Sequence, residues 1–284
     1  MPDLKGFLRP ANLASALRLL AEHGEKAKAL AGGTTLAMAK GGRHDTLVDL
    51  RGVGLDTIKE RPDGLAVGAM VTMTALRRFL ASSPRGALVE AAAGVGAKVL
   101  QNHVTVGGNC VMVYAWSDLP VATLCLNARF TVQGLDNSRT IDADKFFAQH
   151  PTRLLSAGEL LTEVVFPNAG HGEGSAYVKL ARTVTDHAIA SASAWLRVAD
   201  GRITAARVVV GGVSGMPQYL GLTSTALAGL APDEGAFLDA GRRATEEART
   251  VDDIRGSAEY RMAVLPAVVL DALDLAARRA GGAR

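Results

Sequence analysis

Apolar and polar positions along the chain change period several times, which predicts alternating helices and strands. Asn12 can cap a first helix with leucines at helical spacing, and Gly24 stands where its C-terminal cap belongs. Apolar runs at 28–31 and 46–50 then predict two strands. The start of the chain therefore predicts a small α/β unit.

The middle of the chain predicts a second α/β unit, in which short β-like runs alternate with capped helical stretches. Strands are expected at 55–58, 65–67, 104–106, 129–133 and 160–166, and helices at 73–80, 87–95 and 117–126. Pro167 ends the last strand, and the glycine-rich stretch 167–174 is the best linker candidate.

Beyond this linker the pattern predicts strands at 175–181, 188–198 and 203–210, followed by helices at 223–230, 233–247 and 257–279. A turn at 199–202 suits an antiparallel hairpin between the last two strands. The sequence thus predicts an α+β fold whose first domain, 1–170, consists of two α/β subdomains at about 1–54 and 55–170. A C-terminal domain, 171–284, is expected to combine a three-stranded antiparallel sheet with helices.

Composition excludes several classes of protein. The chain has 284 residues, of which 48% are hydrophobic and 21% charged, as in ordinary globular proteins and unlike disordered, collagen-like or disulfide-built chains. Glycine is the exception, with 31 residues. Extra glycine on a normal core indicates tight turns, or loops whose backbone approaches a ligand closely.

Charge and cysteine content argue against a nucleic-acid partner and against a metal cluster held by this chain. The net charge is +3, only 5% of residues are aromatic and no run of basic residues occurs, so a nucleic-acid partner is not expected. Two cysteines, Cys110 and Cys125, are too few for an iron–sulfur cluster and too far apart for a metal-binding pair. The uncharged stretch 99–117 contains polar side chains that make it a poor membrane span, and residues 1–5 begin no signal peptide. We therefore expect a cytoplasmic protein.

Familiar catalytic motifs are missing. No Gly-Lys pair exists to form a P-loop, and after Gly94 and Gly96 a valine, Val99, stands where a Rossmann fingerprint needs a third glycine or alanine. The histidines do not pair at metal-ligand spacing, and no nucleophile stands beside a base in a known motif. The sequence therefore predicts neither a catalytic side chain nor a metal site.

Two glycine pairs remain, at 31–35 and 105–109, and each is expected to follow a strand. Glycine lets a turn present successive backbone N–H groups to one anion, and threonine hydroxyls add neutral donors. Two such loops facing each other would hold a pyrophosphate. Taken singly, a glycine pair is more typical of an ordinary tight turn that links two elements.

Together these motifs resemble the FAD-binding medium subunit of the molybdenum hydroxylases, the family of carbon monoxide dehydrogenase, xanthine dehydrogenase and 4-hydroxybenzoyl-CoA reductase. Residues 31–35 and 105–109 are similar to the two glycine signatures of that family, and Asp118 follows at the family's spacing. Further similar segments are 67–72, 159–167, 177–179 and 253–261.

The resemblance implies a set of FAD-binding residues. Those around the pyrophosphate would be Ala31, Gly32, Gly33, Thr34, Thr35, Leu36, Thr105, Val106, Gly107, Gly108 and Asn109. Asp118 would accept a hydrogen bond from a ribitol or ribose hydroxyl, and Leu161 would lie against the flavin region. Lys179 would approach the isoalloxazine, where a cation stabilises the anionic reduced flavin. From the residues alone, Asp118 is also a helix N-cap and Lys179 also a solvated lysine on a strand.

The chain departs from the family pattern at Thr35, at Gln101 and in the segment 113–116. Thr35 and Gln101 stand where aspartate or serine, and arginine, are usual. Tyr114 and Trp116 lie in a segment that is commonly Ala-Ser-Pro-Ala. These rings would stack on adenine or flavin, pack at a subunit contact, or belong to ordinary core.

The function implied by the resemblance is that of an FAD-dependent oxidoreductase subunit. Electrons would arrive from two [2Fe–2S] clusters on a small subunit, after substrate oxidation at a molybdopterin on a large subunit, and leave to an external acceptor. The complex would be a dimer of heterotrimers. Two alternatives remain: a stand-alone flavin oxidoreductase that uses a nicotinamide, and a non-catalytic scaffold subunit.

Overall fold

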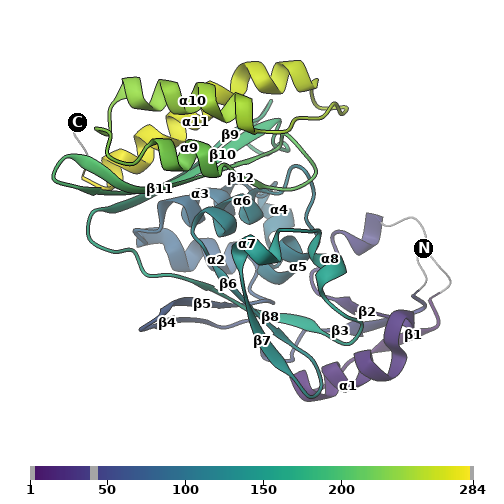
Figure 1. Cartoon of the computed structure of the whole chain (residues 1–284). Helices are drawn as coiled ribbons and strands as arrows, with labels where there is room; N and C mark the ends of the chain where they lie inside the picture. Colours follow the sequence, from purple (N-terminus) through teal and green to yellow (C-terminus); the bar gives the residue numbers. More distant parts are fainter. Residues whose placement is uncertain (1–3, 39–43, 282–284) are drawn as a thin grey trace. The chain divides into compact units, whose positions relative to one another are not determined.

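The computed structural model describes residues 4–38 and 44–281 (Figure 1). Residues 1–3 lie outside this range, and they belong to the segment 1–5 on which the signal-peptide prediction rests. The chain divides into two compact units, each built from three separate stretches. Unit 1 comprises Met1–Leu76, Ala97–Met112 and Ala128–Phe166, and unit 2 comprises Arg77–Gly96, Val113–Asn127 and Pro167–Arg284. The predicted division of the chain into two continuous domains near residue 170 stays a prediction, because each of these compact units combines stretches from different parts of the sequence.

Unit 1 contains a small parallel sheet with the strand order β1–β3–β2. Its elements are β1 (Gly6–Leu8), α1 (Leu13–His23), β2 (Ala27–Leu30) and β3 (Thr46–Asp49). Asn12 caps α1 as predicted, because its side chain accepts a hydrogen bond from the Ser15 N–H at 2.9 Å. Leu17 and Leu20 of α1 pack with Val48 of β3 in one apolar cluster. The predicted helix and two strands are confirmed, whereas the three-residue β1 was not predicted.

The second sheet of unit 1 is antiparallel, with the order β4–β5–β8–β6–β7. Its strands are β4 (Ile58–Arg61), β5 (Gly64–Gly68), β6 (Arg129–Gln133), β7 (Ser138–Asp142) and β8 (Leu160–Phe166). The helices of this part of the chain are α2 (Met73–Phe79), α4 (Lys98–Gln101), α5 (Val106–Val111), α7 (Ala143–Phe146) and α8 (Pro151–Leu154). The buried rings of Phe130 and Phe146 stack with centroids 3.9 Å apart and fix α7 against β6. The strand expected at 55–58 begins only at Ile58.

The strand predicted at 104–106 is wrong. Thr105 forms an isolated β-bridge with Thr72, and the helix α5 begins at the next residue. The Thr105 hydroxyl accepts a hydrogen bond from the Gly108 N–H at 3.1 Å and so caps this helix. The second glycine pair therefore stands in the first turn of a helix rather than in a turn after a strand.

Unit 2 is built on a four-stranded antiparallel sheet with the order β12–β11–β10–β9. Its strands are β9 (Glu173–Leu180), β10 (Ala190–Ala199), β11 (Arg202–Gly211) and β12 (Gln218–Tyr219). Its helices are α3 (Gly86–Gly94), α6 (Asp118–Cys125), α9 (Gly221–Ala226), α10 (Glu234–Glu247) and α11 (Ala258–Arg279). Asp200 and Gly201 take the positive φ angles that the predicted hairpin turn requires. The sheet differs from the three predicted strands by the two-residue edge strand β12.

The two faces of this sheet carry different residues, because side chains alternate along a strand. Helix α11 packs on β9 and β10 and α10 packs on α11, which covers one face with an apolar core (Figure 1). Helices α3 and α6 pack against β9, β10 and β11 through the other face. That second face carries the polar and charged side chains of the sheet, among them Tyr177, Lys179, Trp195, Arg197 and Arg207.

Arg261 is the largest fully buried side chain of the described residues. Its guanidinium donates to the Ile189 carbonyl at 3.1 Å, to the Val251 carbonyl, and to the Asp253 carboxylate at 2.6 Å. Hydrogen bonds from Arg255 and Arg261 hold the pKa of Asp253 well below its usual value. Arg261 therefore fastens the segment before α11 to the sheet.

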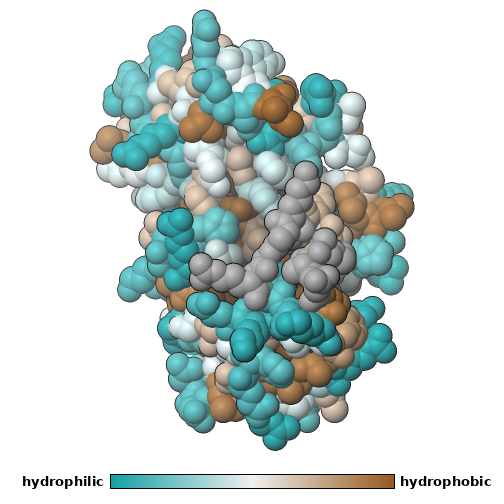
Figure 2. Space-filling model, turned by 90° about the vertical axis from the view of Figure 1, so that its right-hand side faces the viewer, coloured by the Kyte–Doolittle hydropathy of each residue, from teal (hydrophilic) through white to brown (hydrophobic). Residues whose placement is uncertain are grey.

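On the face shown in Figure 2, apolar side chains form small groups among hydrophilic ones. Within residues 4–38 and 44–281, no helix has both the length and the apolar character of a membrane span.

Both cysteines are expected to resist thiol reagents in the folded protein. Cys110 and Cys125 are buried thiols that are not joined in a disulfide, and burial raises the pKa of the Cys125 thiol to about 12. Because the thiolate is the reactive form, Ellman's reagent at pH 8 should label neither thiol before denaturation and both after it. Rapid labelling of either thiol in the folded state would contradict this.

Candidate functional site

The first glycine loop, residues 31–36, has backbone donors that the chain itself does not use. Five successive backbone N–H groups donate no hydrogen bond to any acceptor in the described part of the chain. They are those of Gly32, Gly33, Thr34, Thr35 and Leu36. Gly33 has a φ of +74°, a left-handed conformation that favours glycine. Successive N–H groups around such a residue are suited to binding an anion.

The second glycine loop, residues 105–109, uses its donors within the chain. The Gly107 N–H donates to the Ala69 carbonyl at 2.8 Å, and the Gly108 N–H is taken by the Thr105 side chain. The Asn109 Oδ1 atom, in contrast, is buried and has no hydrogen-bond partner in the described chain. A buried acceptor of this kind fits a ligand hydroxyl, because such atoms are nearly always paired.

The structure brings the two loops into contact. A Cβ atom at Gly32 would lie 1.6 Å from the His103 carbonyl oxygen, just before the second loop. A Cβ atom at Gly108 would lie 4.0 Å from the Cβ of Ala31. Glycine at position 32 therefore allows a backbone approach that no other residue permits.

Two cavities of unit 1 border these loops. The larger, about 510 Å³, is lined by four of the predicted residues, Ala31, Gly107, Gly108 and Leu161. The smaller, about 380 Å³, is also lined by four of them, Ala31, Gly32, Gly33 and Thr105. Lys28 contributes a cation to the larger cavity. Both volumes lie in the range of ligand pockets.

The remaining two predicted residues, Asp118 and Lys179, belong to unit 2 and contact each other. Lys179 is not a solvated lysine: its side chain is only 9% exposed, and its Nζ lies 3.4 Å from an Asp118 carboxylate oxygen. The ammonium also donates to the Gly94 carbonyl at 2.7 Å and to the Asp186 carbonyl at 3.1 Å. Asp118 does not cap α6, because its carboxylate instead accepts from the Tyr177 hydroxyl at 2.5 Å.

Burial dominates the electrostatics of this pair. It raises the pKa of Asp118 above the usual value, although the Lys179 ammonium and the Tyr177 hydroxyl oppose the shift. Burial and the Asp118 charge raise the pKa of Tyr177 well above its usual value. Tyr177 therefore stays a hydrogen-bond donor at neutral pH.

Tyr114 and Trp116 stack on each other, with ring centroids 4.8 Å apart and planes 7° from parallel. The Trp116 ring continues to His187 at 5.0 Å, and the Arg255 guanidinium lies 4.2 Å from its centroid. Burial and Arg255 lower the pKa of His187. The aromatic pair is thus part of a four-residue stack within unit 2.

Comparison with known proteins gives the site its context. The family described as FAD binding domain in molybdopterin dehydrogenase matches residues 3–169, and the CO dehydrogenase flavoprotein C-terminal domain matches residues 175–276. The chain belongs to the FAD-binding medium subunits of the molybdenum hydroxylase family. The chain is therefore a subunit of an FAD-dependent oxidoreductase.

Relatives and solved structures of this family match the medium subunit over its full length. The carbon monoxide dehydrogenase medium chain of Afipia carboxidovorans is 31% identical, with 99% of each chain covered. The alpha subunit of the 6-hydroxypseudooxynicotine dehydrogenase complex of Paenarthrobacter nicotinovorans is also 31% identical, over 93% of this chain and 92% of the relative. A carbon monoxide dehydrogenase structure from Hydrogenophaga pseudoflava superposes with a TM-score of 0.91 at 28% identity, covering 98% and 99% of the two chains.

Sequence reasoning missed the backbone and side-chain partners that hold these residues in place. The His103 carbonyl and Ala69 are such partners in the loops, and Asp186 is one beside Lys179. Backbone contacts of this kind leave no residue-type signal in a sequence.

Proposed function

We propose that this medium subunit binds FAD at the two glycine loops and passes electrons from iron–sulfur clusters of a partner subunit to an external acceptor. The observation that carries the proposal is the row of five free N–H groups at residues 32–36. A pyrophosphate matches such a row without needing a lysine or arginine.

The residues present fit the cofactor in two further respects. The buried Asn109 Oδ1 atom lacks a partner, which suits a ribitol or ribose hydroxyl. The larger cavity adjoins the loops and is lined by Leu161, so we assign to it the part of the dinucleotide next to the pyrophosphate. When bound, FAD supplies the ability to accept and release electrons. The loops contribute binding and orientation.

The roles of Asp118 and Lys179 toward FAD rest on the family resemblance alone. Within unit 2 the three N–H donors of the Lys179 ammonium point to Gly94, Asp186 and Asp118. This arrangement fixes the ammonium in a defined position, as required of a cation that stabilises a reduced flavin.

The family of complexes to which the relatives belong suggests the partner subunits of this chain and where the substrate is selected. We propose a large subunit with molybdopterin and a small subunit with [2Fe–2S] clusters, assembled as a dimer of heterotrimers in the cytoplasm. The relatives bear the names of different substrates, among them carbon monoxide and 6-hydroxypseudooxynicotine, although their medium chains are similarly related to this one. The substrate is therefore chosen outside this subunit.

The scaffold alternative predicts that the well-folded protein takes up no FAD when the cofactor is added in excess. The stand-alone alternative predicts that the isolated chain reduces a dye with NADH.

The proposal is tested on the purified complex. We expect one FAD per medium subunit, and removal of FAD should abolish electron transfer from reduced [2Fe–2S] clusters to an added acceptor, measured by stopped-flow absorbance. Clusters that reoxidise equally fast without FAD would show that electrons leave by another route.

Lys179→Met tests the proposed effect of this cation on the flavin. Loss of the charge should lower the flavin midpoint potential by roughly 30 mV, which corresponds to about 1.4 kcal/mol for a two-electron couple. Lys59→Met, on the exposed strand β4, is the matched control and should leave the potential unchanged. If Lys179→Met keeps its FAD and its wild-type potential, the role of Lys179 is purely structural.

A further inference from the structure

Tyr177 is a buried tyrosine of β9 that the proposed electron transfer does not use. It lies on the same face of the strand as Lys179, because side chains two residues apart point to the same side. The Tyr177 hydroxyl donates to Asp118 Oδ1 at 2.5 Å, and the Lys179 Nζ lies 3.4 Å from the same oxygen atom. One carboxylate oxygen of α6 therefore joins the two side chains of β9.

The short hydrogen bond indicates that Asp118 is ionised. A hydroxyl that donates to a carboxylate lies about 2.5–2.7 Å from the acceptor, closer than in bonds between neutral groups. Tyr177 keeps its proton, since burial and the Asp118 charge raise the pKa of Tyr177 well above its usual value. Asp118 and Lys179 thus form a pair without net charge, and Tyr177 supplies a neutral donor that stabilises the carboxylate.

Burial works against this ionised state. It raises the pKa of Asp118, whereas the Lys179 charge and the Tyr177 hydrogen bond lower it. Loss of either partner therefore moves Asp118 towards the protonated form. Further charged or titratable groups lie on the elements and loops packed around this cluster. They are Glu90 of α3, Arg207 of β11, and Asp186, His187 and Arg255 of the adjoining loops. His187 acts on Asp118 in the same direction as Lys179, but more weakly.

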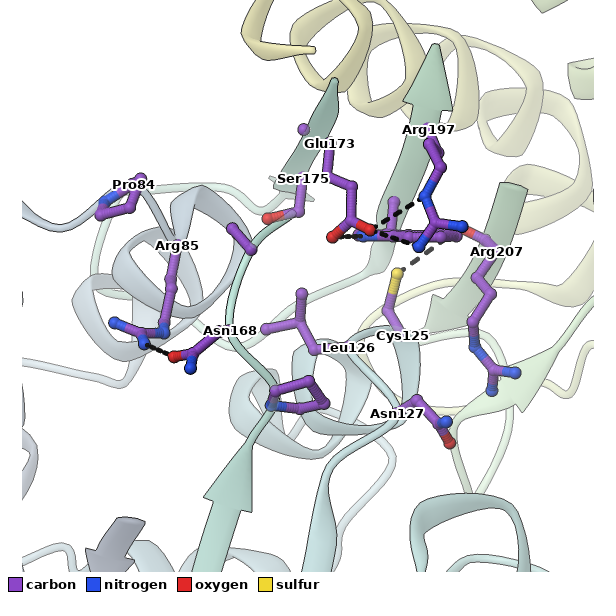
Figure 3. Close-up of a pocket in the computed structure, with 14 residues that line it drawn as sticks. Pro84, Arg85, Cys125, Leu126, Asn127, Asn168, Glu173, Ser175, Arg197 and Arg207 are labelled. Carbon is purple, nitrogen blue, oxygen red and sulfur yellow. Dashed lines mark hydrogen bonds and ion pairs between the residues drawn. The ribbon is translucent and has the colours of Figure 1, made fainter. Parts of the chain in front are cut away.

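Glu173, four residues before Tyr177 on the same face of β9, is a carboxylate held in a different way. Figure 3 shows it beside Arg197 in a cavity of about 310 Å³, where Arg197 Nη2 donates to it at 2.6 Å. Although burial opposes it, hydrogen bonds from the Gly170 N–H, Arg197 and Trp195 hold the pKa of Glu173 below its usual value. Asp118 instead relies on one ammonium and one neutral hydroxyl. Of the two carboxylates, Asp118 is therefore the one that responds to the loss of a single donor.

The protonation state of Asp118 decides how much of the Lys179 charge acts beyond the cluster. When Asp118 is ionised, a negative charge 3.4 Å from the ammonium offsets it. When Asp118 is protonated, the full positive charge remains. A positive charge favours the reduced flavin, because reduction adds negative charge to the ring system.

We propose that Tyr177 is a positioning residue that holds Asp118 ionised and so sets how strongly Lys179 favours the reduced flavin. This inference rests on the proposed function, in which Lys179 approaches the isoalloxazine. Tyr177 acts through Asp118 rather than by contact with the cofactor. With Tyr177 in place, the flavin potential is lower than the Lys179 charge alone would make it.

The flavin midpoint potential of the purified complex, measured as a function of pH, tests the proposal. At mildly acidic pH, Tyr177→Phe should shift the equilibrium about tenfold towards the reduced flavin, which is a rise of about 30 mV for a two-electron couple. This excess should disappear as the pH rises, because Asp118 then ionises in the variant as well. A variant that merely displaced Lys179 would instead have a lowered potential, as expected for Lys179→Met. Tyr219→Phe, which keeps its ring over Arg207 and loses only a hydroxyl, is the matched control and should behave like the wild type.

Asp118→Asn keeps the test valid if Tyr177→Phe does not fold. The amide carries no charge, so the potential should exceed that of the wild type at neutral pH, and adding Tyr177→Phe should change nothing further. The proposal is overturned if the potential of Tyr177→Phe stays at or below the wild-type value at every pH, if its effect persists beside Asp118→Asn, or if Asp118→Asn does not raise the potential. Any of these results in a complex that holds stoichiometric FAD leaves the proposed function standing, whereas a wild-type complex without FAD overturns both.

Discussion

Gly32→Ala is expected to reduce the FAD affinity of the complex by roughly tenfold to hundredfold. The added Cβ would lie 1.6 Å from the His103 carbonyl oxygen, so the first loop must move away from the second. An overpacked contact of this kind costs about 1–3 kcal/mol, and about 1.4 kcal/mol corresponds to a factor of ten in affinity. The loop movement also breaks up the row of donors at residues 32–36. FAD released by heat from the purified complex measures the effect.

Gly215→Ala is the matched control for this variant. A Cβ at Gly215 meets no described atom within 4 Å, and its φ is not in the left-handed region. This variant should keep full FAD content. Stoichiometric, tightly bound FAD in Gly32→Ala would show that the first loop does not hold the cofactor.

Arg261→Met is expected to destabilise the chain by roughly 3 kcal/mol. The wild-type side chain is fully buried and donates to two carbonyls, which lose this partner in the variant, and to Asp253, which keeps its ion pair with Arg255. Removing one member of a buried ion pair costs about 3–5 kcal/mol, and the partial exposure of Asp253 places this case at the lower end. The free energy of unfolding in urea, followed by circular dichroism, is the measurement.

Arg278→Met provides the comparison on the same helix. Arg278 is exposed and pairs with Asp274 one turn away, a contact worth about 0.5 kcal/mol or less. The two arginine variants should therefore differ clearly. A loss below about 1 kcal/mol in Arg261→Met would mean that the segment before α11 is held by other contacts.

The sequence predicts most regular elements because local signals and tertiary packing agree there. Asn12 caps its helix as its residue type predicts, and the Asp200 turn joins its two strands as expected. The run Val104–Val106 fails for a tertiary reason: β-branched residues favour a strand, but the Thr105 cap starts a helix. The edge strand β7 is mostly exposed and polar, so it shows no alternation to detect.

The sequence predicts those features of the candidate site that depend on residue type, and it does not predict those that depend on the folded backbone. The glycine pairs point to loops, whereas the free donors of the first loop and the occupied donors of the second are properties of the folded backbone. The environment of Lys179 depends on carbonyls of Gly94 and Asp186, and the first of these is 85 residues away.

The interleaved stretches of the two units have a consequence for biosynthesis. A nascent chain that ends at residue 170 contains all of unit 1, but it also contains α3 and α6, whose packing partners β9, β10 and β11 are still untranslated. Every residue of α6 is buried in the folded structure, so this intermediate exposes apolar surface to the translating cell. Unit 2 can close only after α11 has left the ribosome. The order of synthesis thus creates a stage at which α3 and α6 exist without the sheet that covers them in the folded chain.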